Sequence, residues 1–492
     1  MNKLRPEQQK LYSVYVPLLL FLIAFFWKFA YIGTRDVCMD EPFTIFHAQK
    51  SVKEILILPS QNEPNPPLFM LLLHFWIELF GNSPYSVRIL PLLFNALTVV
   101  FIYFSGKKFF NLRVALFASA MFLVSTYHFY FALETRAYSL LSLGTAASLY
   151  YFLSFVENDK DRRMLTGLIV SNIVLVYAHY FGWFVVLIQF LASLPYIRDL
   201  KKFLRLMLPL AITGIAFSPM AYLFVKQFLK SSKGTWVQPP GDDEYMAQVH
   251  MFFNAKKVYD LLIWFLLAGL LFKLLSDNRK PASKRMITVF LWWFIPYTFM
   301  YYVSEKVPMF INRYILFNSV GLYLFTAAFL SYLFGDRKFI TGLLFTIAAW
   351  YMYRRIEINS KEFYYREVNN AVNYVKTQSN GQHMVIIHPH WTSLNFSYYY
   401  NRDIFNDTEH YDEHLAAESI YPVYNVMMAR DYVRQNPGKR IIYYQDGSAL
   451  IDPEATIIKY LDSNFVRRDS VFFPQCFNIT VFEPGRRDTL QP

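Results

Sequence analysis

Two adjacent carboxylates, Asp40 and Glu41, follow the first long apolar stretch of the sequence, in the segment MDEPFTIF. A carboxylate acts as a general base toward a hydroxyl group when it is held in a partly dry place. The aromatic residues Phe43 and Phe46 would provide such surroundings at the edge of a bilayer. The alternative is structural, because Asp followed by Glu-Pro also suits the first turn of a helix.

A second group of chemistry-bearing residues lies in the segment ETRAY, between two further apolar stretches. Glu134 and Arg136 carry opposite charges in a turn that has almost no other polar residue, so the turn is not a solvated loop, and Tyr138 lies beside them. An arginine suits a phosphate because its charge is permanent and its guanidinium binds two oxygens at once. The alternative is that these charges only anchor the ends of membrane spans.

Two more polar groups stand at the ends of apolar stretches. His179 and Tyr180 occur in AHYFG, and Lys306 and Arg313 flank VPMFIN. The two cations could grip a lipid phosphate or merely meet headgroups, and the His-Tyr pair also suits an aromatic-belt anchor. No His-x-x-His or similar spacing supports a metal at His179, so a divalent metal stays open and no cofactor is certain.

No nucleotide-binding motif accompanies these residues. The sequence has no P-loop, no G-x-G-x-x-G and no G-x-S-x-G. Energy from nucleotide hydrolysis is therefore not indicated, and an activated substrate would have to arrive on a carrier such as a membrane lipid.

The elements that position these groups are membrane helices. Of the 492 residues, 55% are hydrophobic and 17% charged, against about 25% charged in ordinary soluble domains. Apolar runs of about 20 residues, each long enough to cross a bilayer, recur as far as residue 352. The net charge of +12 does not imply nucleic acid, because Lys and Arg in membrane proteins mark cytoplasmic loops and anionic lipid surfaces.

We predict eleven membrane spans. They are 13–33, 88–105, 113–132, 137–156, 164–179, 182–197, 206–225, 258–275, 287–304, 314–334 and 338–353. A further apolar run, 66–81, is short and begins with two prolines. If it crossed the membrane, the basic clusters GKKFFNLR, ENDKDRR, YIRDLKKFLR and SDNRKPASKR would lie outside, against the positive-inside rule. We therefore expect surface helices in a long first outer loop, 34–87.

This topology makes residues 1–353 the membrane domain and brings all the polar groups above to the outer face. The long segment 226–257, rich in Gly and Pro, would form a mobile lid there. Residues 354–492 read as a small outer α/β domain, with strands at HMVIIHP and KRIIYYQDG, a helix at PEATIIKYLDSNF and a closing hairpin at DSVFFPQCFNITVFEP. The two cysteines, Cys38 and Cys476, would share that side, and their pairing stays open.

Several segments discussed above, taken together, resemble the polyprenyl-phosphate-sugar-dependent glycosyltransferases of the GT-C fold. Within that fold it is similar to the protein O-mannosyltransferase/ArnT-like group, comprising family 39 and RgtA-like relatives. The resemblance covers about residues 10–330 and rests on four blocks in this order: MDEP, NPPLFMLLLHFWIELFGNSPYSVRILP, GKKFFNLRVALFASAMFLVSTYHFYFALETRAYSL and VPMFINRY. Many relatives carry His or Lys before the Pro-Pro pair, where this chain has Asn65, so other cations would carry more of the phosphate binding.

The resemblance implies transfer of a sugar from a polyprenyl-phosphate donor to a hydroxyl acceptor, with inversion, on the outer face of a bacterial cytoplasmic membrane. It makes Asp40 the base, with Glu41 and Glu134 positioning the acceptor or a cation. Arg136 and Arg313 would stabilise the phosphate leaving group. The bilayer and the lipid-linked sugar are the expected partners, and the acceptor is unknown.

Two other functions compete with this one. A lipid-glycan transporter or flippase would place charged residues at mid-membrane, whereas the centres of the predicted spans are nearly free of charge. A scaffold that only presents the C-terminal domain gives no reason for ionisable residues to gather at one face.

Overall fold

The computed structural model describes residues 11–61, 63, 65–232, 237–275, 283–335, 337–358, 366–379, 381–447, 451–473 and 477–485. Its contacts divide the chain into two compact units. The membrane unit holds the described residues of 1–32, 53–72 and 85–358, and the C-terminal unit holds those of 33–52, 73–84 and 359–492. Two parts of the predicted first outer loop therefore belong, by their contacts, to the C-terminal unit.

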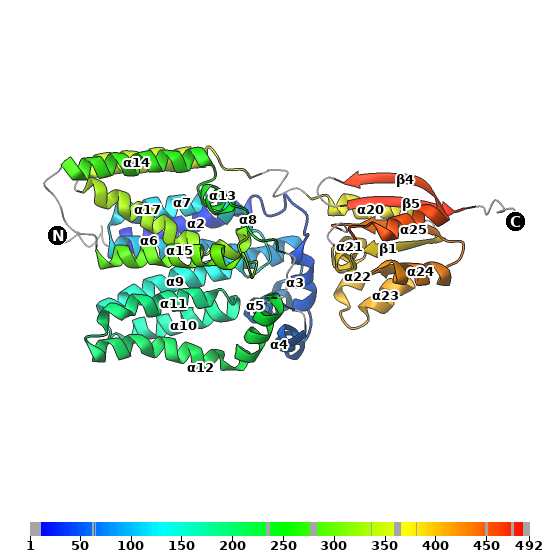
Figure 1. Cartoon of the computed structure of the whole chain (residues 1–492), viewed down its shortest axis with the longest axis horizontal. Coiled ribbons are helices and arrows are strands. Elements are labelled where there is room, and N and C mark those ends of the chain that lie inside the picture. The colour runs from blue at the N-terminus through cyan, green and yellow to red at the C-terminus, as the bar shows by residue number, and fades with distance from the viewer. Residues whose placement is uncertain are drawn as a thin grey trace. The chain divides into compact units, whose positions relative to one another are not determined.

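Apolar helices make up the membrane unit and run largely alongside one another (Figure 1). They are η1 (Leu11–Tyr15), α2 (Val16–Phe29), α4 (Val52–Gln61), α6 (Pro84–Phe109), α7 (Leu112–Leu123), α8 (Thr126–Ala132), α9 (Tyr138–Glu157), α10 (Arg162–Ala178), α11 (Gly182–Ser193), η2 (Leu194–Tyr196), α12 (Leu200–Ser231), α13 (Glu244–Phe252), α14 (Lys256–Leu275), α15 (Lys284–Val303), α16 (Asn312–Ile315), α17 (Asn318–Phe334) and α18 (Lys338–Tyr353). The polytopic helical architecture is thus confirmed.

The number of spans stays a prediction. Each predicted span coincides with a helix, yet only six described helices have the length and hydropathy of a span, and the bent pair α7–α8 would add a seventh. The doubtful run 66–81 forms α5 (Leu68–Phe80), which lies across the division between the units. Its 13 residues fall short of the roughly 20 that a span needs.

Short polar side chains start several of these helices. Asn111, Asp161, Asp199 and Ser283 each accept a hydrogen bond from a backbone N–H in the first turn of α7, α10, α12 and α15. Such N-caps satisfy donors that the helix itself leaves unpaired. All four caps lie in or next to the predicted basic loops, so the local sequence sets where those helices begin.

The segment 226–257, expected to be a long lid loop, is helical over much of its length, whereas its movement as a lid stays a prediction. α12 continues to Ser231, and α13 begins at Glu244. Tyrosine hydroxyl groups hold α13 in place, because Tyr297 donates to the carbonyl of Tyr245 at 2.5 Å and Tyr323 donates to that of Phe252 at 2.6 Å. Residues 233–236 lie outside the described residues.

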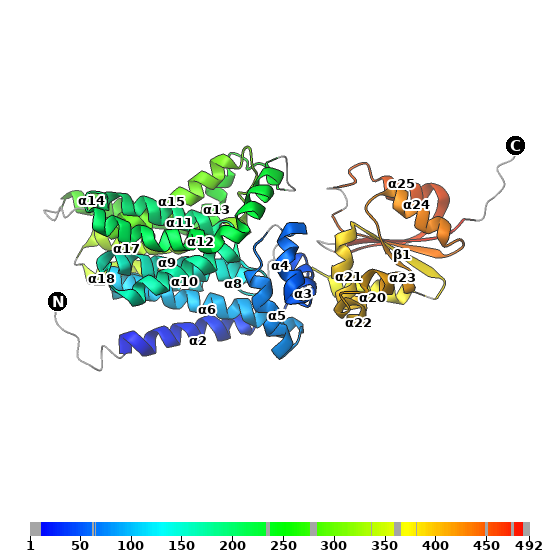
Figure 2. The same cartoon turned by 90° about the horizontal axis from the view of Figure 1, so that it is seen from below.

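The C-terminal unit is a three-layer α/β domain (Figure 2). Its sheet has the order β2-β1-β3-β5-β4, in which β1 runs parallel to β2 and β3, and β5 runs antiparallel to β3 and β4. The strands are β1 (His383–His388), β2 (Ile420–Pro422), β3 (Arg440–Gln445), β4 (Phe465–Phe473) and β5 (Phe477–Pro484). The helices and helical turns are α3 (Asp40–Ala48), α20 (Val368–Gln378), η3 (His390–Thr392), α21 (Ser393–Tyr400), α22 (Arg402–Asn406), α23 (Tyr411–Ala417), α24 (Val426–Gln435) and α25 (Thr456–Asn464).

The strands predicted at HMVIIHP and KRIIYYQDG, the helix and the closing antiparallel pair are all confirmed. α24 and α25 cover one face of the sheet, and α20 and α21 cover the other. Buried residues of the strands, such as Ile386 and Tyr443, join apolar residues of α24 and α25 in one core. The pairing of Cys38 with Cys476 cannot be described, because Cys476 lies outside the described residues.

Candidate active site

The turn between α8 and α9 is buried. Glu134, Arg136 and Tyr138 expose 4%, 9% and 3% of their surface. The turn is tight, because the backbone N–H of Arg136 donates to the carbonyl of Glu134 at 2.7 Å. Ser139 ties the start of α9 back to α8 by donating to the carbonyl of Phe131 at 2.9 Å. An ion-bearing turn is therefore enclosed by protein, as its sequence predicts.

The turn between α10 and α11 meets the first turn through His179. After α10 ends at Ala178, the His179 ring lies 6.4 Å from that of Tyr138 and 5.5 Å from that of Tyr314. Gly182 makes this turn possible, because a Cβ there would lie 2.5 Å from the Leu175 carbonyl. Three segments far apart in the sequence thus converge on one imidazole.

The chemistry of this imidazole is well defined. His179 is buried and lies within reach of the positive charges of Arg136 and Arg313. Its Nδ1 accepts a hydrogen bond, so the ring is neutral. The backbone N–H of Phe181 donates to Nδ1 at 3.2 Å, so the proton of the neutral ring resides on Nε2. That Nε2 is buried and has no hydrogen-bond partner among the described residues.

The two predicted cations near α15 and α16, Lys306 and Arg313, differ in burial and in whether their charge acts on His179. Arg313 is half-buried, lies over the Tyr314 ring at 5.7 Å and acts electrostatically on His179. Lys306 is exposed and is not among the groups that act on His179. The structure thus brings Arg136 and Arg313 to one imidazole and leaves Lys306 at the surface.

Asn65 lies beside a buried carboxylate that sequence reasoning missed. Both its backbone N–H and its side-chain amide donate to Glu63, at 3.1 and 2.7 Å. Glu63 exposes only 3% of its surface. Burial, and then the negative charge of Glu63, raise the pKa of Tyr180 to about 12. A polar residue before the Pro-Pro pair was the available signal, but Glu63 itself looked like an ordinary loop residue.

The carboxylate pair belongs to the C-terminal unit. Asp40 opens α3 and is half-buried, whereas Glu41 exposes 1% of its surface. Met39, directly before Asp40, has φ of +56°. Non-glycine residues rarely adopt such a backbone conformation, and they do so where surrounding contacts enforce it.

Those contacts come from the C-terminal domain. The Asn395 side chain donates to the Met39 carbonyl at 3.4 Å, and the backbone N–H of Val37 donates to the Tyr399 hydroxyl at 2.6 Å. α3 also packs its Phe46 ring against Phe405 and Tyr411, with centroids 5.7 and 4.9 Å apart. The backbone that presents Asp40 is therefore held by residues more than 350 positions later in the chain.

A buried lysine lies near the end of α2, inside the predicted span 13–33. Lys28 is fully buried, and its Nζ donates to Asn95 at 2.5 Å and to the carbonyl of His128 at 3.3 Å. The His128 ring in turn contacts Ser319 at 2.6 Å. Among the described residues, no group of three His, Cys, Asp or Glu side chains comes together as a metal site.

Part of the sequence matches a family model of glycosyltransferases. Residues 64–235 match the family model of dolichyl-phosphate-mannose-protein mannosyltransferase. This segment contains Asn65 and the turns of Arg136 and His179. No curated protein matches the chain significantly.

Solved structures match the chain over nearly its whole length. ArnT from Cupriavidus metallidurans bound to undecaprenyl phosphate has a TM-score of 0.60 at 10% identity, covering 97% of this chain and 98% of that one. The apo oligosaccharyltransferase of Archaeoglobus fulgidus has a TM-score of 0.53 at 11% identity, covering 98% and 76%. The chain therefore has the GT-C fold of these glycosyltransferases, and its residues 64–235 carry the sequence pattern of the mannosyltransferase family.

Proposed function

We propose that the protein is a membrane glycosyltransferase that moves a sugar from a polyprenyl-phosphate donor to a hydroxyl acceptor. The observation that carries this proposal is the environment of His179. A buried Nε2–H without a partner among the described residues lies where two guanidinium groups act. A buried donor without an acceptor is costly, and an oxygen of the donor phosphate would supply that acceptor.

The transfer requires one proton movement and one displacement. Asp40 takes the proton of the acceptor hydroxyl, whose oxygen then bonds to the anomeric carbon of the sugar. The bond from that carbon to the phosphate oxygen breaks, and the configuration inverts. Arg136, Arg313 and the Nε2–H of His179 stabilise the negative charge that returns to the lipid phosphate. Glu41 and Glu134 position the acceptor.

Buried charges favour transfer over transport. A transporter places ionisable residues near the middle of its spans. Among the described residues, the buried cations within long helices of the membrane unit lie near helix ends, because Lys28 is the penultimate residue of α2 and Arg88 is the fifth residue of α6. The prediction that the site faces the outside of a bacterial cytoplasmic membrane rests on the basic loops and is part of this proposal.

The test is a transfer assay on purified protein with Asp40→Asn. Asparagine keeps the size and most hydrogen bonds of the side chain but cannot accept the proton. General-base catalysis contributes typically about 10²–10⁴-fold, so turnover should fall by that factor. Binding of undecaprenyl phosphate should not change, because the phosphate is held elsewhere. The first donor to use is mannose linked to undecaprenyl phosphate.

The matched control is Asp403→Asn, an exposed aspartate at the start of α22 in the same unit. It should retain full turnover. Glu41→Gln should reduce turnover less than Asp40→Asn does. If Asp40→Asn transfers sugar as fast as the wild type, Asp40 is only a helix start and the proposed mechanism is wrong.

A further inference from the structure

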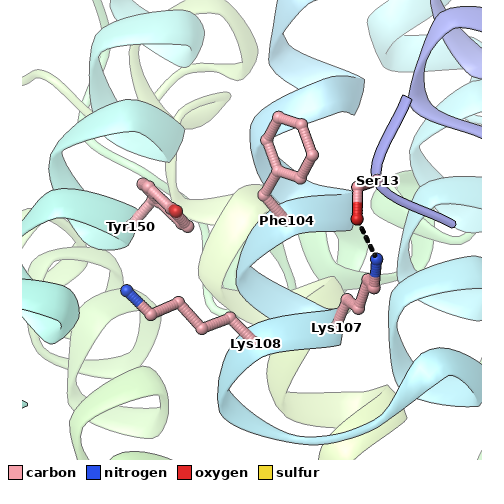
Figure 3. A pocket seen from close by; sticks show the side chains of 5 residues that line it. All are labelled: Ser13, Phe104, Lys107, Lys108 and Tyr150. Atoms are coloured by element: carbon pink, nitrogen blue, oxygen red, sulfur yellow. Dashed lines mark hydrogen bonds between the residues drawn. The ribbon is translucent and has the colours of Figure 1, made fainter. Parts of the chain in front are cut away.

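A basic pocket lies at the far end of the membrane unit from the candidate site. It has a volume of about 330 Å³ and is lined by Ser13, Phe104, Lys107, Lys108 and Tyr150 (Figure 3). Tyr150 lies twelve residues after Tyr138 on the same helix, α9. At a rise of 1.5 Å per residue, the two residues are about 18 Å apart along the helix axis. The pocket is therefore separate from the turn that carries Arg136.

The two lysines point to opposite sides of the pocket. Figure 3 shows Lys107 reaching toward Ser13 and Lys108 reaching toward Tyr150. The Nζ of Lys107 donates to the carbonyl of Tyr12 at 2.6 Å and to Ser13 at 3.3 Å. The Nζ of Lys108 donates to the Ser154 hydroxyl at 2.7 Å and lies 5.2 Å from the centre of the Tyr150 ring. All these partners are neutral.

No carboxylate in the described part of the chain pairs with either lysine. The nearest acid along α9, Glu157, forms an ion pair with Arg285 instead. Within the described residues, two positive charges therefore share a hollow in which neither forms an ion pair with a carboxylate. Such a site favours an anion, and a phosphate group carries the charge and the acceptor oxygens that two ammonium groups require.

The surroundings indicate that this phosphate belongs to a lipid. Leu11, Val14 and Tyr15, on the helix that carries Ser13, expose 44%, 51% and 50% of their surface, as expected for side chains that face acyl chains. The lysines end α6, so they stand at headgroup depth. Basic pockets between membrane helices on the cytoplasmic side are known to bind anionic headgroups.

We propose that this pocket binds the phosphodiester headgroup of an anionic phospholipid in the leaflet that faces the basic loops. Lys107 and Lys108 supply the charge, Ser13 supplies a hydroxyl donor, and the rings of Phe104 and Tyr150 contact the glycerol and the upper acyl chain. The site is independent of the sugar-transfer proposal, because it uses none of the same residues.

The experiment measures lipid enrichment around the full-length protein. The protein is reconstituted in phosphatidylcholine nanodiscs containing phosphatidylglycerol, and the lipids it retains are counted by native mass spectrometry. Each lysine beside an anionic headgroup contributes to the binding free energy of that lipid. The loss of two lysine charges should therefore reduce phosphatidylglycerol enrichment about 30-fold. The variant is Lys107→Gln/Lys108→Gln, which keeps long polar side chains without charge.

The matched control is Lys160→Gln/Arg163→Gln, which removes two exposed charges from the next basic loop. It should leave enrichment within about 2-fold of the wild type, because water and salt screen exposed charges outside the pocket. Lys107→Arg/Lys108→Arg should retain the enrichment, and undecaprenyl phosphate binding reports that each variant is folded. Equal enrichment in the wild type and the glutamine variant would overturn the proposal. Displacement of phosphatidylglycerol by inorganic phosphate would assign the pocket to a soluble phosphate and overturn the lipid assignment.

Discussion

Arg136 should be the main determinant of donor binding. It is nine-tenths buried and acts on the neutral His179. A hydrogen bond to a charged group contributes about 1.5–3 kcal/mol, and a guanidinium that grips a phosphate makes two of them. Arg313 and the His179 Nε2–H would remain in Arg136→Ala and recover part of the loss. We therefore expect a loss of about 2–4 kcal/mol, or about 30- to 700-fold weaker binding.

The assay is a titration of purified protein with undecaprenyl phosphate. Arg136→Lys should recover no more than about tenfold, because a lysine restores the charge but not the planar fork. The matched control is Arg205→Ala, which breaks a partly exposed ion pair with Asp159 at 2.7 Å. Such a pair is worth about 0.2–1 kcal/mol, and its loss should not affect lipid binding.

Two outcomes would refute this reasoning. If Arg136→Ala binds undecaprenyl phosphate as tightly as the wild type while Arg313→Ala does not, the phosphate is held by Arg313 alone. If both variants bind normally, the environment of His179 is not the phosphate site, and the observation on which the proposed function rests has another explanation.

Three further results should follow. Tyr399→Phe removes the hydroxyl that accepts a backbone N–H at 2.6 Å, so turnover should fall while donor affinity, measured by the same titration, stays constant. Asn95→Leu deprives buried Lys28 of its closest acceptor and should lower stability by about 1–3 kcal/mol in thermal unfolding, while Lys28→Met added to it should restore most of the loss. A reporter fused after residue 110 should report the cytoplasm and one after residue 360 the outer side; finding both on one side would overturn the eleven-span topology.

The sequence was sufficient where the signal is local. Long apolar runs predicted helices at all eleven proposed spans, and short apolar runs that end in turn residues predicted β1 and β3. β2 escaped notice because three residues carry no detectable pattern. The segment 226–257 was misread because Gly and Pro at 234–241 mark turns but say nothing of the tyrosines that hold the following helix.

Side-chain environments were harder to predict because packing decides them. Glu134 and Arg136 were recognisable, since two opposite charges in an apolar turn are rare. The burial of Lys28 and Glu63 was not recognisable. A lysine near the end of an apolar run and a glutamate in a polar segment both normally reach water, and only the tertiary structure shows that neither does. The neutral state of His179 likewise depends on burial and on the backbone N–H of Phe181, and the tertiary structure sets both.

The hydrogen bond between Val37 and Tyr399 also sets an order of events during synthesis. The two residues are separated by 362 positions, and chains grow at about 5–20 residues per second, so Val37 waits roughly 20–70 s for its partner. During that interval the segment carrying Asp40 has already been synthesised, but the C-terminal residues that hold it have not. On the proposed mechanism, a nascent or truncated chain would therefore carry the proposed donor-binding arginines without a positioned base, and we predict that sugar transfer begins only when the C-terminal domain has folded.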